Sequence, residues 1–185
     1  MPAIELPDPP LTDRRVTLRP WTDDDAAWIA RASRDPLVPR FTTVPADNTE
    51  ARVRGRILAH AALLARGELV ELLGVETTTG RLIGPVGLHH VEWTHRTAEV
   101  GYWTAHEARG RGLTTAAVRL ICAWAFGPLG LDRVELRAHV DNPASQRVAE
   151  KVGFTREGIL RGVQAGPEGA RRSVVVFGLL AGELT

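Results

Sequence analysis

The sequence has little cysteine and almost no net charge. Its 185 residues include a single cysteine, so an internal disulfide is excluded. The formal net charge of +1 gives no field that would attract the whole chain to nucleic acid or to an acidic membrane surface. Cys122 lies among apolar residues at helical spacing, and we interpret it as a small core residue rather than a nucleophile.

Long hydrophobic runs are also absent. No stretch of eighteen consecutive apolar residues occurs, and the opening MPAIELPDPPLTD has neither a basic region nor a hydrophobic one. These absences predict that the chain has no membrane span and no secretory signal. With an ordinary apolar content of 44%, they favour a cytoplasmic enzyme or binding protein.

The residue pattern predicts one domain of mixed strands and helices. Residues 1–14, which contain four prolines, are expected to form an irregular lead-in to a single domain over 15–185. Pro85 predicts a bulge or an edge position in its strand. The expected strands cover 15–21, 69–77, 81–92, 97–104, 132–140, 155–164 and 171–180, and the expected helices cover 22–33, 49–67, 113–126 and 142–154. We expect Asp47 or Asn48 to cap the second helix and Asn142 to cap the fourth.

The segment Arg109-Gly110-Arg111-Gly112 precedes the third helix and contains a contradiction. A helix N-terminus carries partial positive charge and favours acidic residues, yet two arginines stand here. One reading is a tight turn with both arginines in water. The other is an anion site, in which bare backbone and the first helical amides bind a phosphate that the arginines also contact. The preceding strand and the following helix favour the anion site.

Two common phosphate-binding motifs fit this segment poorly. Thr115 stands where a dinucleotide fingerprint needs its third glycine, and no acidic residue follows at the distance that a parallel unit requires. The Gly-Lys-Ser/Thr of a P-loop is absent. A different phosphate ligand is therefore expected.

The hexapeptide Arg109-Gly-Arg-Gly112-Leu-Thr114 resembles the Gln/Arg-x-x-Gly-x-Gly/Ala hallmark of the GNAT superfamily of acyl-CoA-dependent N-acyltransferases. Thr114 departs from the small residue that is usual there but leaves its amide available. The segments AEVGYW and NPASQRVAEKVGFTREGILRG resemble the branch that contains the ribosomal-protein N-terminal (Rim-type) acetyltransferases. The similarity extends from Arg15 to the C-terminus.

This resemblance implies an α+β fold. The expected sheet is central, mixed and largely antiparallel, with about seven strands and four flanking helices. It should splay between its fourth strand, over 97–104, and its fifth, over 132–140. A homodimer is common in the resembling branch and is carried here as an expectation by analogy.

The resemblance also implies a cofactor, acetyl-CoA or another acyl-CoA, and no metal. Its pantetheine arm would bond to backbone near Trp103 and Thr104 and to the side chain of Asn142. Its diphosphate would lie on the backbone amides of Arg109, Gly110, Arg111, Gly112, Leu113, Thr114 and Thr115.

Glu99 is our candidate for the catalytic base that takes a proton from the acceptor amine. On a strand it shares a face with Gly101 and Trp103, and the glycine would leave room beside it. An ordinary surface ion pair is the alternative, and His89 and His90 on the preceding strand are competing bases. By family analogy, a backbone N–H near Trp103 would stabilise the oxyanion of the thioester.

Ser145 is our candidate for the group that stabilises the departing CoA thiolate. Many family members use a tyrosine on the fourth helix, but Ala149 occupies that position and the only tyrosine, Tyr102, lies elsewhere in the sequence. The branch with Asn-x-x-Ser implies the serine instead. An ordinary first-turn serine beside the cap Asn142 is the alternative.

The acceptor should enter between residues 34–48 and 164–172. Arg40, Arg171 and Arg172 in these walls could serve an acidic acceptor or a donor such as succinyl-CoA, or they could be solvated surface charges. Three functions stay open. They are an N-acyltransferase for a protein N-terminus or small amine, an acyl-CoA-binding sensor or scaffold with little turnover, and a different phosphate-ligand enzyme.

Overall fold

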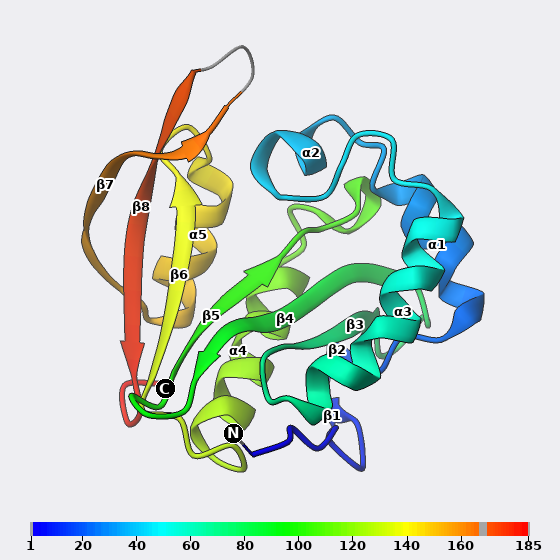
Figure 1. The fold of residues 1–185 in the computed structure, drawn as a ribbon, viewed down its shortest axis with the longest axis horizontal. Helices are drawn as coiled ribbons and strands as arrows, with labels where there is room; N and C mark the ends of the chain where they lie inside the picture. The colour runs from blue at the N-terminus through cyan, green and yellow to red at the C-terminus, as the bar shows by residue number, and fades with distance from the viewer. Residues whose placement is uncertain (1, 167–169, 185) are drawn as a thin grey trace.

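The computed structural model describes residues 2–166 and 170–184. In this part of the chain, eight strands form one open sheet in the order β1-β2-β3-β4-β5-β6-β8-β7 (Figure 1). Every neighbouring pair is antiparallel except β5 and β6, which are parallel. The strands are β1 (Leu11–Thr12), β2 (Val16–Arg19), β3 (Val70–Glu76), β4 (Leu82–Glu92), β5 (Thr97–Tyr102), β6 (Arg133–His139), β7 (Thr155–Ala165) and β8 (Arg171–Leu180).

Helices cover both faces of this sheet. In Figure 1, α3 lies in front of the sheet with α1 beside it, and α4 and α5 lie behind it. The helices are α1 (Ala26–Ala32), α2 (Leu37–Phe41), α3 (Glu50–Ala65), α4 (Leu113–Phe126) and α5 (Pro143–Val152), with short 3-10 turns η1 (Asp23–Asp25) and η2 (His106–Ala108). The α+β architecture inferred from the sequence is therefore confirmed, with one more strand and one more helix than expected.

The main core lies between the sheet and the α4–α5 layer. Alternate strand residues such as Val100 and Leu136 meet the apolar face of α4, where Ile121 and Cys122 are fully buried. Burial of each such aliphatic side chain contributes roughly 1.5–3 kcal/mol. The same burial raises the pKa of Cys122 to about 12, so the thiol is an inert core residue, as the sequence suggested.

Two elements were not anticipated. In the lead-in, β1 pairs Leu11 with Leu18 of β2 and extends the sheet by one short strand. Within residues 34–48, α2 forms although three prolines suggested a loop. Pro36 caps α2 and Pro39 lies in its first turn, where backbone N–H groups have no helical partner to lose.

The cap of α3 is Thr49, so the expectation of Asp47 or Asn48 was wrong. The Thr49 hydroxyl accepts a hydrogen bond from the Arg52 amide. Asn48 is buried instead, and its Nδ2 donates to the Ser33 hydroxyl at 2.9 Å. Asn48 is used to join the end of α1 to the start of α3, which sequence position alone could not reveal.

The irregularity expected at Pro85 is present as a bulge in a central strand. The β3–β4 register shifts next to Gly84, whose φ of 145° is unfavourable for any residue with a side chain. A Cβ on Gly84 would overlap the carbonyl oxygen of Trp103. The bulge thus brings the backbone of β4 against the residue that follows β5.

Candidate active site

The sheet opens between β5 and β6, as the resemblance implied. These strands pair at Thr97–Arg133, Ala98–Val134 and Glu99–Glu135, and no pair follows beyond Glu99. Figure 1 shows the two strands diverging from that point toward the end that bears α2. The backbone of β5 from Val100 onward therefore has an edge that β6 does not cover.

Backbone alternation decides which amides face this opening. The Trp103 carbonyl lies against Gly84, and the Ala105 N–H donates to the Ile83 carbonyl at 2.8 Å. Trp103 thus directs its backbone toward β4, and the N–H groups of its two neighbours, Tyr102 and Thr104, point toward the opening. The Trp103 side chain is buried on the α1–α3 face of the sheet, where it stacks on Trp28 with 6.2 Å between the ring centroids.

The loop before α4 presents free backbone N–H groups. Gly110 and Gly112 adopt left-handed conformations, with φ of 71° and 73°, and Gly112 is the N-cap of α4. Among the described residues, no carbonyl or side chain accepts a hydrogen bond from the amides of 110–115; the first bonded amide is that of Ala116. Unpaired amides at a helix N-terminus, together with the helix dipole, favour a negatively charged group.

The arginines of the loop are held by carboxylates rather than solvated. Arg109 donates from Nη1 to Asp35 at 2.9 Å and from Nε to the Thr104 carbonyl at 3.0 Å. Arg111 pairs with Glu76 at the end of β3. Both guanidinium groups are therefore held in place by residues remote in sequence.

The two carboxylates stay charged in this setting. Burial alone would raise the pKa of Asp35, but hydrogen bonds from the Leu37 amide and from Arg109 hold it below its usual value. A hydrogen bond from the Thr79 hydroxyl, supported by Arg111, lowers the pKa of Glu76. Each ion pair is thus intact at neutral pH.

Thr114, which departs from the family hallmark, has a defined partner. Its hydroxyl lies 2.7 Å from that of Thr104. This contact links the end of β5 to the first turn of α4, and the Thr114 amide has no acceptor. The departure from a small residue therefore leaves the loop able to bind an anion.

Ser145 and Asn142 meet at the start of α5. The Asn142 side chain accepts from the Ser145 amide at 3.2 Å and caps the helix. The Ser145 hydroxyl lies 2.9 Å from the Tyr102 hydroxyl. Burial raises the pKa of Tyr102 to about 12, so the phenol stays protonated and able to donate.

Tyr102 was missed as a member of the site because it is 43 residues from Ser145 in the chain. Strand alternation could have found it. Tyr102 shares its strand face with Ala98 and Val100, which face the α4–α5 layer. The side chain therefore faces the layer that contains Ser145.

Glu99 shares its strand face with Gly101, as expected, and this is the face of the sheet opposite to that of Tyr102. Its side chain is 25% exposed, with Arg137 Nε at 3.6 Å and His90 Nδ1 at 3.4 Å. The room expected beside Gly101 is filled, because a Cβ there would lie 3.0 Å from the His89 ring. Glu99 is thus one of a cluster of paired groups rather than a solitary base.

The two competing histidines differ in environment. His90 is 82% exposed and has a φ of 50°. His89 lies on the face of the sheet and is partly buried there, and this burial lowers the pKa of its imidazole. His89 is therefore neutral at pH 7 and packed against Gly101, and His90 is a solvated neighbour of Glu99.

The arginines expected in the acceptor walls have local partners. Arg40 pairs with Asp141 at 2.8 Å, and Arg172 donates to the Arg40 carbonyl. Arg171 Nε donates to the Gly162 carbonyl at 2.7 Å. Arg172 thereby ties β8 to α2 across the opening. Residues 167–169, part of the wall expected over 164–172, lie outside the described residues.

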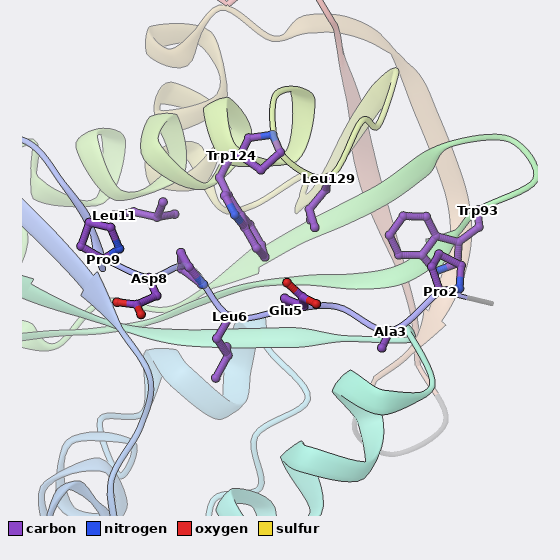
Figure 2. A pocket seen from close by; sticks show the side chains of 12 residues that line it. Pro2, Ala3, Glu5, Leu6, Asp8, Pro9, Leu11, Trp93, Trp124 and Leu129 are labelled. Carbon is purple, nitrogen blue, oxygen red and sulfur yellow. The ribbon is translucent and has the colours of Figure 1, made fainter.

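A separate surface groove of about 560 Å³ lies far from this site. Figure 2 shows residues of the N-terminal segment on one side of it and Trp93, Trp124 and Leu129 on the other. Trp124 is near the C-terminal end of α4, and the free amides are at its N-terminal end, about 15–20 Å away at helical rise. The groove is therefore not part of the candidate site.

Within residues 2–166 and 170–184, no helix is long and apolar enough to cross a membrane. The same residues contain no cluster of three or more potential metal ligands.

A mostly antiparallel sheet that splits at its one parallel pair, with an anion-binding loop at the adjoining helix, defines the acyl-CoA-dependent N-acyltransferase class. Residues 15–155 match the family described as Acetyltransferase (GNAT) domain, and the chain belongs to that family.

Similar proteins agree with this membership. The chain is 40% identical over 99 residues to "Putative ribosomal N-acetyltransferase YdaF" of Bacillus subtilis (strain 168), a match that covers 52% of the chain and 54% of that relative. It is 32% identical over 154 residues to "Uncharacterized N-acetyltransferase YoaA" of the same organism, covering 83% and 86%. The structure of Mycobacterium smegmatis RimJ in complex with CoA-disulfide superposes with a TM-score of 0.80 at 26% identity, over 91% of this chain and 83% of that one.

Proposed function

We propose that the protein transfers an acetyl or related acyl group from acyl-CoA to a primary amine by direct attack in a ternary complex. The observation that carries the proposal is the row of free amides over 110–115 in a loop with two ion-paired arginines, beside the opening between β5 and β6. The proposed acceptor is a protein N-terminus or a small amine. The proposed compartment is the cytoplasm.

Binding of the donor follows from the loop. The diphosphate of CoA accepts hydrogen bonds from the amides over 110–115, with Arg109 and Arg111 beside it. The pantetheine arm runs through the β5–β6 opening and bonds to the backbone of Thr104. Asn142 contacts the arm from the start of α5 while still capping that helix.

The chemistry needs proton transfers at both ends of the reacting group. A lysine-like amine has an unperturbed pKa of about 10.4, and freeing its lone pair at pH 7 costs on the order of 4 kcal/mol. Glu99 lies on the face from which an amine can approach and takes up that proton directly or through water. The amine nitrogen then bonds to the thioester carbon, and the carbonyl oxygen becomes an oxyanion.

The N–H groups of Tyr102 and Thr104 that point into the opening are the proposed oxyanion donors, in place of the Trp103 amide. When the carbon–sulfur bond breaks, the CoA thiolate receives a hydrogen bond from Ser145. The protonated phenol of Tyr102, 2.9 Å from the serine hydroxyl, supplies the next donor in that chain.

Two substitutions test the catalytic roles. Glu99→Gln and Ser145→Ala are each expected to lower kcat about tenfold, toward the low end of general acid–base effects, with CoA affinity unchanged within about twofold. Steady-state release of CoA thiol measures kcat, and calorimetric titration measures CoA affinity. Glu92→Gln, an exposed change on β4, is the matched control. Unchanged turnover in both variants would refute these roles.

The reaction itself is tested by mass spectrometry. Acetyl-CoA, succinyl-CoA and longer donors are incubated with small amines and with ribosomal-protein N-terminal peptides. A mass increase that matches the acyl group on the amine is expected for at least one pair. CoA binding without transfer to any amine would favour a sensor or scaffold, and no CoA binding would reject the donor altogether.

A homodimer is part of the proposal. The edge strand β7 pairs only with β8 among the described strands, and it exposes Ile159, Leu160 and Val163. Open strand edges with apolar side chains favour association. Light scattering is expected to give twice the 20.1 kDa chain mass, and Ile159→Lys should shift the protein toward the monomer. A monomer at all concentrations would contradict this part.

A further inference from the structure

His139, the last residue of β6, is a buried histidine that the chemistry above does not use. Its side chain is 8% exposed, and its Nδ1 has neither solvent access nor a hydrogen-bond partner among the described residues. Buried polar atoms are nearly always paired, so an unpaired imidazole nitrogen beside an enzyme's reaction channel requires an explanation. One explanation is a ligand that supplies the missing hydrogen-bond partner.

The alternation of β6 places this imidazole on the amine side of the sheet. Val134, Leu136 and Ala138 face the α4–α5 core, so His139 faces the other way together with Arg137. Arg137 lies 3.6 Å from Glu99, which confirms that this face is shared with the proposed base. His139 stands two residues, about 6–7 Å, further along the diverging strand than Arg137.

The backbone of His139 is fixed next to the proposed thiol site. Its carbonyl accepts from the Asn142 amide at 2.9 Å and from the Gln146 side chain at 3.1 Å. Ser145 begins the same helix on the opposite side of the sheet, paired with Tyr102. A thioester with its sulfur near Ser145 would therefore have the His139 ring on the face from which an amine attacks.

The groups packed around the ring keep it neutral. Phe41 of α2 lies 5.6 Å away between ring centroids. Burial lowers the pKa of His139, Arg172 of β8 and Arg40 of α2 lower it further, and only Asp141, in the turn before α5, opposes them. Asp141 is itself engaged by Arg40. A neutral imidazole has an acceptor nitrogen, and at pH 7 that nitrogen can bond to an amine N–H.

We propose that His139 binds the acceptor amine through an imidazole nitrogen and takes up its proton as the nitrogen–carbon bond forms. This inference rests on the proposed function. The amine loses one proton to the imidazole, its nitrogen bonds to the thioester carbon, and the carbon–sulfur bond breaks to release CoA thiolate. Glu99 takes the first proton of the ammonium group, as proposed above, and His139 takes the second as the nitrogen–carbon bond forms; the imidazolium then returns its proton to solvent.

The kinetic test uses His139→Gln, which retains hydrogen bonding but cannot take up a proton. At pH 7.5, kcat/KM for the amine is expected to fall about tenfold, with CoA affinity unchanged. The ratio of wild-type to variant kcat/KM should decline toward one as pH falls through the lowered pKa of His139, which lies below the ordinary imidazole value of ~6.5, because protonation removes the wild-type base. His95→Gln, at an exposed turn position, is the matched control.

Two outcomes of this test overturn the inference. Unchanged kcat/KM in His139→Gln removes any role in turnover. A deficit that stays constant across pH shows a packing role and no proton transfer.

A binding measurement on the wild-type protein separates this inference from the proposed function. Histidine-labelled protein saturated with CoA is titrated with a peptide that has an N-terminal serine and, separately, with spermidine. The His139 imidazole resonance is expected to shift with at least one probe, and that of His95 is not. If the His139 resonance shifts but no acyl group is transferred, only the proposed function is refuted. If an acyl group is transferred to a probe that leaves the His139 resonance unshifted, only this inference is refuted. Failure of both refutes both.

Discussion

Replacing Arg109 by glutamate is expected to raise the dissociation constant of CoA about a hundredfold, equivalent to roughly 2.7 kcal/mol. The substitution removes the guanidinium group of the residue that precedes the free amides over 110–115 and that is held by Thr104 and Asp35. It also introduces a carboxylate that repels both the diphosphate and Asp35, the present partner of Arg109. Calorimetric titration with CoA measures the change.

A companion variant decides whether Arg109 acts on the ligand or only on the loop. Asp35→Asn releases Arg109 from its ion pair, so CoA affinity should be maintained or increased if the guanidinium binds phosphate. If Arg109 merely holds Asp35 in place, Asp35→Asn should weaken CoA binding as much as the arginine substitution does. Arg156→Glu on the exposed edge of β7 makes the same change in net charge far from the loop. An equal loss of CoA affinity in Arg156→Glu would indicate a general electrostatic effect and would contradict a specific contact between Arg109 and CoA.

Gly84→Ala is expected to lower the free energy of unfolding by about 3 kcal/mol or more. Gly84 has a φ of 145°, and a Cβ there would overlap the Trp103 carbonyl oxygen and lie 3.2 Å from its carbonyl carbon. Backbone strain and forced overlap each cost roughly 1–3 kcal/mol. Relief would require Trp103 and Thr104 to move, so CoA binding should weaken as well. Urea unfolding monitored by tryptophan fluorescence measures the stability change.

Gly55→Ala is expected to change the free energy of unfolding in the opposite direction in the same assay. Gly55 is exposed within α3, and a Cβ there meets nothing within 4 Å. Alanine should therefore stabilise the protein by up to about 1 kcal/mol through helix propensity. If Gly84→Ala stays within 1 kcal/mol of the parent protein, the close approach of β4 to Trp103 has no structural importance.

Local pattern was sufficient for most of the elements. Alternation along 132–140 and helical spacing after Leu113 reflect which face of each element is buried, and β6 and α4 follow them. The paired glycines of the loop likewise predicted a tight turn or bare backbone before a helix, and both adopt left-handed conformations. The pattern failed at α2, where Pro36 is the N-cap and Pro39 lies in the first turn, so neither removes an N–H that has a helical partner.

Side-chain partners were the larger omission. Thr49 and Asn48 both have the chemistry of a cap, and only the packing of α1 against α3 assigned Asn48 to Ser33. Tyr102 was set aside because it lies outside the fourth expected helix, yet its hydroxyl meets Ser145. His139 gave no signal, since a lone histidine at a strand end resembles any other polar residue.

By itself, the sequence determined most of the elements, their order and the glycine-rich loop before α4, because these depend on residues close together in the chain. Only the tertiary structure decided that Asp35 holds Arg109, that Tyr102 meets Ser145 and that the His139 ring has an unpaired nitrogen. The first pair is separated by 74 residues and the second by 43, and no local periodicity specifies such a meeting. Contacts of this kind are set by how the helices pack across the two faces of the sheet and by where β5 and β6 part.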